Sequence, residues 1–293
     1  MPPIAEVLLP SALAFIMFSV GITLVPADFT RLLREPRAVT AGLIGQLLVL
    51  PLAAWALAVA WRLPPGMAVG LMILGACPGG ASSALITHLA RGTAALSITL
   101  TAITSVAAVV TVPLVVNLAL ALFLAEESEV ELSVAKLVRG VFLITTVPVI
   151  AGMALRALRP ALADRLQGGI NRVATALFVL IVVAFFVKER ATIVAHLATV
   201  GPAAASLVVV VMAAGIGLAL AFRLDRRDGI AIASECGLQN AALGIFIATA
   251  VLATSALAVP SVVYALLMNV GALAFVFIAR RWTGPAAAAP ARG

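Results

Sequence analysis

Long apolar stretches follow one another along the whole chain, each separated from the next by charged or turn-forming residues. A run of about 20 apolar residues can cross a hydrocarbon core of about 30 Å as an α-helix. The runs are continuous and do not alternate apolar with polar positions, which excludes the strands of a membrane barrel. Nine stretches can be counted, at roughly 4–25, 38–61, 66–90, 94–124, 133–155, 171–187, 198–222, 229–252 and 258–279. The pattern predicts an all-α polytopic membrane protein with nine transmembrane helices.

The composition agrees with this pattern. Of the 293 residues, 63% are hydrophobic and 11% are charged, which leaves too little polar surface to cover a soluble domain. The net charge of +7 could indicate nucleic-acid binding, but the basic residues lie in short clusters between the apolar stretches. Such clusters are typical of the loops of an inner-membrane protein. We therefore expect a multi-pass protein of the cell inner (plasma) membrane, with no nucleic-acid partner.

The distribution of basic residues predicts an orientation. Nine spans place the two termini on opposite sides of the membrane. If the C-terminus is cytoplasmic, 14 of the 19 basic residues fall in cytoplasmic loops. Because such loops are enriched in Lys and Arg, we expect the N-terminus outside and the C-terminus inside. The acidic segment EESEVE (126–131) then faces outward, and the Ala/Pro-rich end at 283–293 is predicted to be a disordered tail.

Two segments of the chain resemble each other. GACPGGASSALI (75–86) interrupts the third stretch, and SECGLQNAALGI (234–245) interrupts the eighth. They lie five spans apart, so they run through the bilayer in opposite directions, as in an inverted repeat. Pro78 and the glycines after it predict a break in the third helix. The break in the eighth helix rests on Gly237 and the polar residues beside it. We predict two broken helices that cross near the middle of the membrane.

Glu235 is the only acidic residue deep inside an apolar stretch. A charge at the bilayer centre costs about 2.5–3.5 kcal/mol on insertion scales. One interpretation is a protonated or paired glutamate that holds helices together, and the other is an ion or proton site. Further oxygen-bearing side chains within the stretches include Gln46, Ser97, Thr101, Gln239 and Asn240. Oxygen ligands with one carboxylate suit a hard monovalent cation and not a transition metal. The residues favour an ion site.

At these residues the chain resembles a known family. GACPGGASSALITHLARGTAALSITLTAITS (75–105) and ECGLQNAALG (235–244) resemble the two core motifs of the bile acid:sodium symporter family. MFSVGITL (17–24) resembles that family's first span, and the similarity runs from about residue 10 to 280. Members have ten spans or nine. The resemblance implies one transporter domain over 1–293, with the broken helices beside two sodium sites. Its panel would comprise about 4–61 and 133–187, and its core about 62–124 and 198–280.

The resemblance also implies roles for single residues. The first sodium site would use Ser83, Ser97, Thr101 and Glu235. The second would use Gln46, Glu235, Gln239 and the backbone carbonyls of Cys236 and Leu238. The substrate would contact Gly80, Ser82 and Asn240. The chain departs from the family in two places: Ala84 stands where asparagine is usual, and Ala81 where threonine is usual. The loss at Ala84 leaves open whether one or two sodium ions bind.

Together these features favour a sodium-coupled symporter. It would import a small organic anion, such as a bile acid-like, keto acid-like or pantoate-like metabolite, by alternating access, and it would act as a monomer. An alternative is a proton-coupled or facilitative carrier in which Glu235 titrates. A third interpretation, an intramembrane enzyme or sensor, needs a nucleophile or a second acid paired with Glu235. The stretches contain neither, so we expect no enzymatic activity.

Overall fold

The computed structural model describes residues 3–25, 28, 30, 33–80, 82–124 and 134–283. The regular elements within these ranges are all helical. Ala81, the acidic segment 126–131 and the tail beyond 283 lie outside the described residues. The helices are α1 (Pro3–Gly21), α3 (Pro36–Ile44), η1 (Gly45–Val49), α4 (Leu50–Ala60), α5 (Pro65–Ala76), α6 (Ser83–Leu89), α7 (Ala94–Phe123), α8 (Val134–Val141), η2 (Phe142–Thr146), α9 (Val147–Leu158), α10 (Pro160–Lys188), α11 (Arg190–Ala221), α12 (Arg226–Gly237), α13 (Ala241–Phe246), η3 (Ile247–Val251), η4 (Ser255–Ala258) and α14 (Val259–Thr283).

Each predicted apolar stretch is helical over most of its length. Within the described ranges, six helices are long and apolar enough to cross a membrane, judged by length and composition: Pro36–Ala60, Ala94–Phe123, Leu137–Leu158, Pro160–Lys188, Arg190–Ala221 and Ser255–Trp282. The other three stretches correspond to α1 and to the two interrupted pairs α5–α6 and α12–α13, whose pieces are shorter. The all-helical membrane class is confirmed, and the count of nine spans stays a prediction.

Two helices begin earlier than the apolar pattern predicted. α10 begins at Pro160, not near 171, and α11 begins at Arg190, not near 198. Both added segments contain charged residues, which the pattern assigned to loops. Arg, Gln and Ala nevertheless favour helix, and Pro160 suits the first turn of one. The helices therefore extend past the point where their sequence stops being apolar.

Two spans contain a widened π turn just before a proline. η1 (Gly45–Val49) precedes Pro51, and η2 (Phe142–Thr146) precedes Pro148. Proline lacks an N–H group and its ring clashes with the carbonyl four residues earlier. A π turn inserts one extra residue and is a known way to accommodate such a clash. η1 also contains the buried Gln46.

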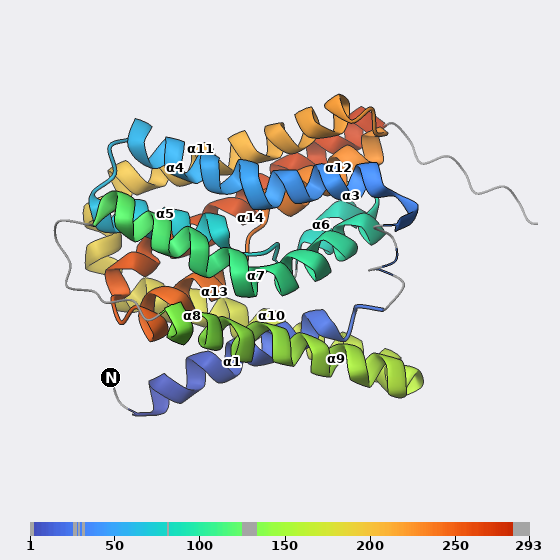
Figure 1. Ribbon diagram of the computed structural model, residues 1–293, viewed down its shortest axis with the longest axis horizontal. Helices are drawn as coiled ribbons and strands as arrows, with labels where there is room; N and C mark the ends of the chain where they lie inside the picture. The colour runs from blue at the N-terminus through green and yellow to red at the C-terminus, as the bar shows by residue number, and fades with distance from the viewer. Residues whose placement is uncertain are drawn as a thin grey trace, which may run out of the picture.

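The helices form two groups with the interrupted helices between them. Figure 1 shows α1, α9 and α10 on one side of the bundle and α3, α4, α11 and α12 on the other. α1 packs against α9 and α10, and α11 packs against α12 and α14. The helix at 36–60, which we expected in the panel, contacts α5, α7, α11 and α12, all elements of the expected core. The panel–core division itself stays a prediction.

The outer surface of the bundle is apolar. On α7, every fourth residue forms an exposed stripe with 46–63% of each side chain accessible: Val106, Val110, Leu114, Leu118 and Leu122. A stripe of this size would be an aggregation surface in water, whereas acyl chains cover it in a bilayer. The exposed apolar side chains therefore fit a membrane protein better than a soluble one.

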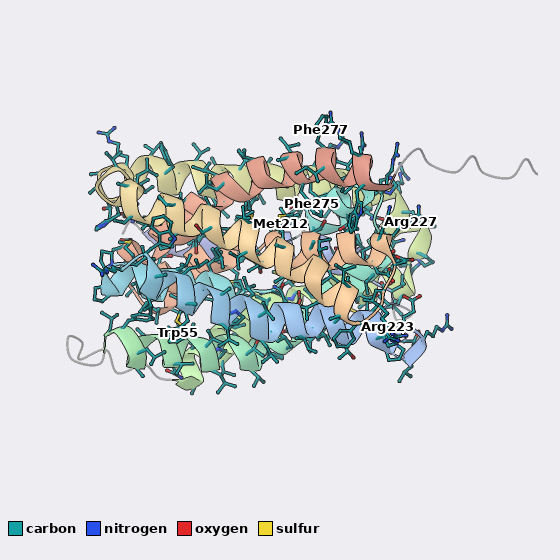
Figure 2. All side chains as sticks on the ribbon, turned by 90° about the horizontal axis from the view of Figure 1, so that it is seen from above. Trp55, Met212, Arg223, Arg227, Phe275 and Phe277 are labelled. Carbon is teal, nitrogen blue, oxygen red and sulfur yellow. The ribbon has the colours of Figure 1, made fainter. Side chains whose placement is uncertain are left out.

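Several basic residues gather at one end of the bundle. Figure 2 shows Arg223 and Arg227 together at that end. There Arg37 donates to the carbonyl of Phe222 at 2.6 Å, and Arg280 donates to the carbonyl of Leu89 at 2.7 Å. These bonds satisfy carbonyls at helix C-termini. Segments that we expected on the cytoplasmic side thus lie close together, and the absolute orientation stays a prediction.

Candidate ion and substrate site

Both predicted helix breaks are present, and each has a local cause. The backbone of Cys77 is extended, with φ −68° and ψ 148°, because a residue before proline is disfavoured in the helical region. In the second pair no proline is involved. There the chain leaves the helix at Leu238, and the side chain of Asn240 accepts a hydrogen bond from Leu243 N at 3.1 Å. Asn240 therefore caps α13, which is a signal for the break that the sequence analysis missed.

The two breaks pair with each other. The N–H of Gly80 donates to the carbonyl of Leu238 at 2.6 Å, and the N–H of Asn240 donates to the carbonyl of Pro78 at 3.0 Å. Gly79 and Gln239 form an antiparallel bridge between these bonds. The breaks thus satisfy each other's backbone polar groups inside an apolar protein. The two breaks therefore lie against each other in a paired segment, here called the crossing; its place near the middle of the membrane and the inverted repeat stay predictions.

The pairing needs glycine at its centre. A Cβ atom on Gly79 would lie 1.9 Å from Oε1 of Glu235, and one on Gly80 would lie 3.1 Å from the carbonyl oxygen of Gln239. No side chain can be placed at Gly79 without moving the carboxylate. The double glycine therefore allows Glu235 to lie directly against the broken segment.

The residues expected at the first sodium site form one hydrogen-bonded group, here called the carboxylate cluster: Ser83, Ser97, Thr101 and Glu235. Thr101 donates to Oε1 of Glu235 at 2.6 Å, and Ser97 donates to Oε2 at 2.8 Å. The hydroxyl of Ser83 lies 3.1 Å from that of Ser97 and 3.4 Å from that of Thr101. All four side chains are buried. Helices α6, α7 and α12 thus bring five oxygen atoms together.

No basic side chain among the described residues pairs with Glu235. Its hydrogen bonds come from neutral hydroxyls, which cannot cancel a full charge. A buried carboxylate without a counter-charge is costly, so it must take up a proton or a cation. The carboxylate cluster supplies the hard oxygen ligands that an alkali cation prefers.

Four residues form a second group, here called the glutamine cluster: Gln46, Cys77, Cys236 and Gln239. Nε2 of Gln46 donates to the carbonyl of Cys77 at 3.0 Å and to Oε1 of Gln239 at 2.8 Å. Nε2 of Gln239 donates to the carbonyl of Cys236 at 2.7 Å. The structure therefore brings together Gln46, Gln239 and the Cys236 carbonyl, as expected for the second site. The carbonyl of Cys77 is an addition that the sequence analysis missed.

Two other expected members of the second site have different partners. The carbonyl of Leu238 accepts the short bond from Gly80 that joins the two breaks. Glu235 meets Gln239 through its backbone carbonyl, at 3.3 Å, while its carboxylate bonds within the carboxylate cluster. The two clusters therefore share Glu235 through different atoms of the same residue.

A cavity of about 470 Å³ opens beside the crossing. The three residues expected to contact substrate, Gly80, Ser82 and Asn240, all line it. Ser83, Thr101 and Gln239 also reach it, so the cavity adjoins both clusters. Ala84 faces the same cavity and offers no side-chain oxygen there. A volume of this size suits a small molecule, and small-molecule sites are typically apolar with a few polar groups.

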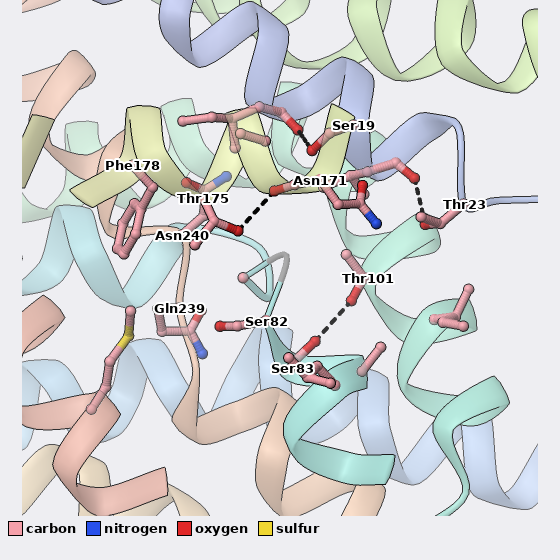
Figure 3. Close-up of a pocket in the computed structure, with 18 of the residues that line it drawn as sticks. Ser19, Thr23, Ser82, Ser83, Thr101, Asn171, Thr175, Phe178, Gln239 and Asn240 are labelled. Carbon is pink, nitrogen blue, oxygen red and sulfur yellow. Dashed lines mark hydrogen bonds between the residues drawn. The ribbon is translucent and has the colours of Figure 1, made fainter. Parts of the chain in front are cut away.

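The cavity has polar residues that the sequence analysis overlooked. Figure 3 shows Ser19 on α1, Thr23 just beyond the end of α1, and Asn171 and Thr175 on α10 around it. Asn171 and Thr175 are four residues apart on α10, so they lie on one face of that helix. The spacing of these two polar residues by one helical turn was the available signal. Asn269 on α14 also lines the cavity.

Comparison with known proteins identifies the family. The sequence pattern of the Sodium Bile acid symporter family matches residues 10–196, more than half of the chain. The chain belongs to this family. The match confirms the resemblance found in the sequence motifs, and it makes the protein a member of a transporter family and not an enzyme.

Individual relatives agree with this assignment. The chain is 32% identical over 263 residues to the "Uncharacterized sodium-dependent transporter YocS" of Bacillus subtilis, covering 88% of this chain and 78% of that protein. It is 29% identical over 274 residues to the "Probable sodium/metabolite cotransporter BASS2, chloroplastic" of Oryza sativa, covering 94% of this chain and 64% of that one. Over 99 residues it is 36% identical to the "Sodium-dependent organic anion transporter" of Rattus norvegicus, or 34% of this chain and 27% of that protein. The chain thus spans less than two thirds of the rice relative.

Proposed function

We propose that this protein is a sodium-coupled symporter that imports a small organic anion across the inner membrane. The observation that carries the proposal is the buried carboxylate of Glu235, which has three hydroxyls around it and no counter-charge among the described residues. A sodium ion would supply the missing charge. Family membership and the printed names of the relatives support the same activity.

In this proposal the first sodium ion binds at the carboxylate cluster. Glu235 contributes the charge, and Ser83, Ser97 and Thr101 contribute neutral oxygens. The second ion binds at the glutamine cluster, where side-chain oxygens of Gln46 and Gln239 and the carbonyls of Cys77 and Cys236 are the ligands. The N–H groups of both amides now donate to these carbonyls. Each amide must therefore turn its N–H groups away before its own oxygen and the carbonyls can face a cation. Leu238 would take part only through the second lone pair of its carbonyl.

Binding of sodium would be coupled to binding of the anion through the crossing. A cation at the carboxylate cluster ties α12 to α6 and α7. Gly80 and Asn240, the residues that pair the two breaks, also line the cavity. An ion that orders this backbone therefore orders the surface that meets the anion. Differential affinity of this kind is what coupling between two ligands requires.

Transport would follow from movement of two helix groups. We assign α1, α8–α9 and α10 to the panel. Unlike the division expected from the sequence, which put residues 36–60 in the panel, we assign α3–α4 to the core because of their contacts there, together with α5–α6, α7, α11, α12–α13 and α14. The cavity lies where they meet, since its lining comes from α1 and α10 on one side and from α6, α7 and α14 on the other. Rocking of one group against the other would expose the cavity to each side in turn. The basic end of the bundle would be cytoplasmic, with the N-terminus outside and the C-terminus inside.

Proton coupling is the second candidate, and Ala84 is the observation that favours it. This position faces the cavity beside the carboxylate cluster without an oxygen. With one ligand fewer, sodium binding is weakened, and a proton on Glu235 would neutralise the carboxylate instead. The two candidates differ in the ion that drives uptake. In both of them Glu235 is the residue that binds this ion.

Uptake into proteoliposomes tests the proposal. The purified full chain is reconstituted, and uptake of a panel of small organic anions is measured with an inward sodium gradient, an inward proton gradient or neither. We expect accumulation only with the sodium gradient. Accumulation driven by protons and indifferent to sodium would assign the protein to the second candidate. Equal uptake under all three conditions would leave a facilitative carrier.

A further inference from the structure

A second cavity, of about 410 Å³, lies where α10, α11 and α14 meet, and it shares no lining residue with the cavity beside the crossing. It is here called the α11 groove. Its lining comes from Phe186 of α10, from one face of α11 within residues 193–205, and from Val263, Leu266 and Leu267 of α14. None of the lining residues has a charged or hydrogen-bonding side chain. The groove therefore suits an apolar chain and not an ion or a polar metabolite.

The α11 groove has a buried floor and an open rim. Ile193 and Val263 lie at the floor, where only 2% and 3% of each residue is exposed. Val194 and Leu197 lie at the rim, where 70% and 49% is exposed. In a bilayer such a surface faces acyl chains, and a groove left empty would forfeit the dispersion contacts of its lining. An acyl chain can therefore enter the groove from the side.

Gly201 keeps the α11 groove open. A Cβ atom on this residue would meet only Cδ1 of Leu197, at 3.6 Å, which is ordinary contact. On the same helix, a Cβ atom on Gly215 would lie 2.7 Å from the backbone of Ala233, so there the packing of the bundle requires glycine. Packing does not require it at Gly201, and glycine weakens a helix interior relative to other residues. What this glycine provides is space in the groove.

The α11 groove has a positive charge at one end. Arg190 begins α11 one turn before Val194, so it shares the helix face that lines the groove. The residue is exposed, and its guanidinium has no ion-pair or hydrogen-bond partner in the described part of the chain. The neighbouring carboxylate of Glu189 lies 3.7 Å from Nζ of Lys188 and accepts from Thr192 at 3.4 Å. The turn between α10 and α11 thus carries one uncompensated positive charge.

The length of the groove matches one leaflet of a membrane. At 1.5 Å per residue, the part of α11 from Arg190 to Ala205 is about 22 Å long. Half of a bilayer with its head groups is about 20–22 Å thick. Arg190 would therefore lie at the level of the head groups, with the groove beside the acyl chains of the same leaflet. Lys188 and Arg190 belong to the side that we expect to face outward, so the preference for positive charge in cytoplasmic loops does not explain them.

We propose that the α11 groove binds one anionic phospholipid, with the phosphate on Arg190 and one acyl chain along the groove. Lipid tails outside the groove are as apolar as the groove itself, so burial of the chain alone gives no selectivity. The charge-assisted bond to Arg190 supplies the preference for an anionic head group, and the groove supplies the contacts that hold one chain in place. The bound lipid would touch α10 on one side and α11 and α14 on the other. These helices belong to the two groups that move against each other in the proposed function.

Photolabelling of the purified full chain tests the site. The probe is phosphatidylglycerol with a diazirine midway along one acyl chain, and peptide mass spectrometry measures labelling of residues 186–205 and 263–267. Unlabelled phosphatidylglycerol or phosphatidylcholine with the same acyl chains is then added as a competitor. We expect phosphatidylglycerol to compete at about fivefold lower concentration, the gain from one basic residue at a membrane surface. Absence of labelling in both segments, or equal competition by the two lipids, would overturn the inference.

A variant that fills the groove tests the acyl-chain part. Gly201→Leu places a side chain where the chain would lie, and leucine favours helix more than glycine does. We expect labelling of both segments to fall several-fold. Gly217→Leu is the matched control, because Gly217 is exposed on the same helix, lies outside the groove and has nothing within 4 Å of a Cβ atom. Val194→Phe, at the exposed rim, should give the same loss if Gly201→Leu does not fold. Labelling as strong in the groove variants as in Gly217→Leu would overturn the inference.

A variant without the charge tests the head-group part. Arg190→Gln should keep the labelling by the acyl chain and remove the preference for phosphatidylglycerol over phosphatidylcholine. Arg139→Gln is the control, because Arg139 is an exposed basic residue of α8 that is expected on the same side and does not line the groove. We expect it to keep the fivefold preference. A preference that survives in Arg190→Gln would show that another residue reads the head group.

The lipid site and the proposed transport function fail separately. Labelling is measured without sodium gradient or substrate, so its loss would overturn the lipid site and leave sodium coupling intact. Uptake that is indifferent to sodium would overturn sodium coupling, and the lipid site would still stand in that case.

Discussion

Replacing Glu235 by glutamine separates the charge of the carboxylate from its hydrogen bonds. In the structure, Oε1 accepts from Thr101 at 2.6 Å and Oε2 accepts from Ser97 at 2.8 Å. Glutamine keeps one oxygen for Thr101. Its NH₂ group can donate to Ser97, whose own proton then turns to Ser83, 3.1 Å away. One bond is reversed and none is lost, so we expect the free energy of unfolding to change by less than about 1 kcal/mol in the absence of sodium.

The effect of the Glu235→Gln substitution on stability appears when sodium is added. A ligand that binds only the folded state stabilises it by RT ln(1 + [L]/Kd), about 1.4 kcal/mol at tenfold excess over Kd. For a chain of this length that corresponds to an increase in Tm of roughly 2–3 °C. We expect this increase in the wild type and not in Glu235→Gln. Glu235→Asp keeps the charge with a shorter side chain, so it should retain part of the increase at higher sodium concentration.

Thermal unfolding of purified protein in sodium chloride and in choline chloride, at equal ionic strength, is the assay. Glu189→Gln is the matched control, because Glu189 lies at the turn between α10 and α11, near Lys188, and outside both clusters. This control variant should keep the full increase in Tm with sodium. If sodium stabilises Glu235→Gln as much as the wild type, the carboxylate is not a sodium ligand and the argument from its uncompensated charge is wrong.

Further predictions concern the crossing, the ligand count and the orientation. Gly79→Ala should lower Tm and abolish uptake, since its Cβ would lie 1.9 Å from Oε1 of Glu235; normal uptake would contradict the tight pairing. Gln239→Ala should abolish sodium-driven uptake, and transport with unchanged sodium dependence would remove the glutamine cluster from the mechanism. Ala84→Asn should keep uptake and raise its Hill coefficient for sodium; an unchanged coefficient would mean that no missing ligand was restored. A cysteine at Ser128 should react with an impermeant maleimide from outside, against a low background because both native cysteines are buried; labelling only from the cytoplasm would reverse the proposed orientation.

The sequence alone determined the features that depend on local chemistry. Apolar stretches indicate membrane helices in any fold, because the bilayer and not the neighbouring chain selects them. Pro78 breaks its helix whatever lies beside it, since the missing N–H and the ring clash are its own. Glu235 was recognisable because a carboxylate in an apolar stretch is costly wherever the helix packs. For the same reason the cluster around it could be proposed residue by residue once the family motifs were seen.

Only the tertiary structure decided what depends on neighbouring helices. Gln46 lies in the π turn η1 and donates to Gln239, which lies 193 positions further along the chain. Asn171 was read as the edge of a span, but in the structure it lies well inside α10, which begins at Pro160. A polar residue on an apolar helix can bond to its own backbone, face another helix or face a cavity, and all three look alike in sequence. The packing of α1 and α10 against the crossing makes that choice, because it determines which helix face borders empty space.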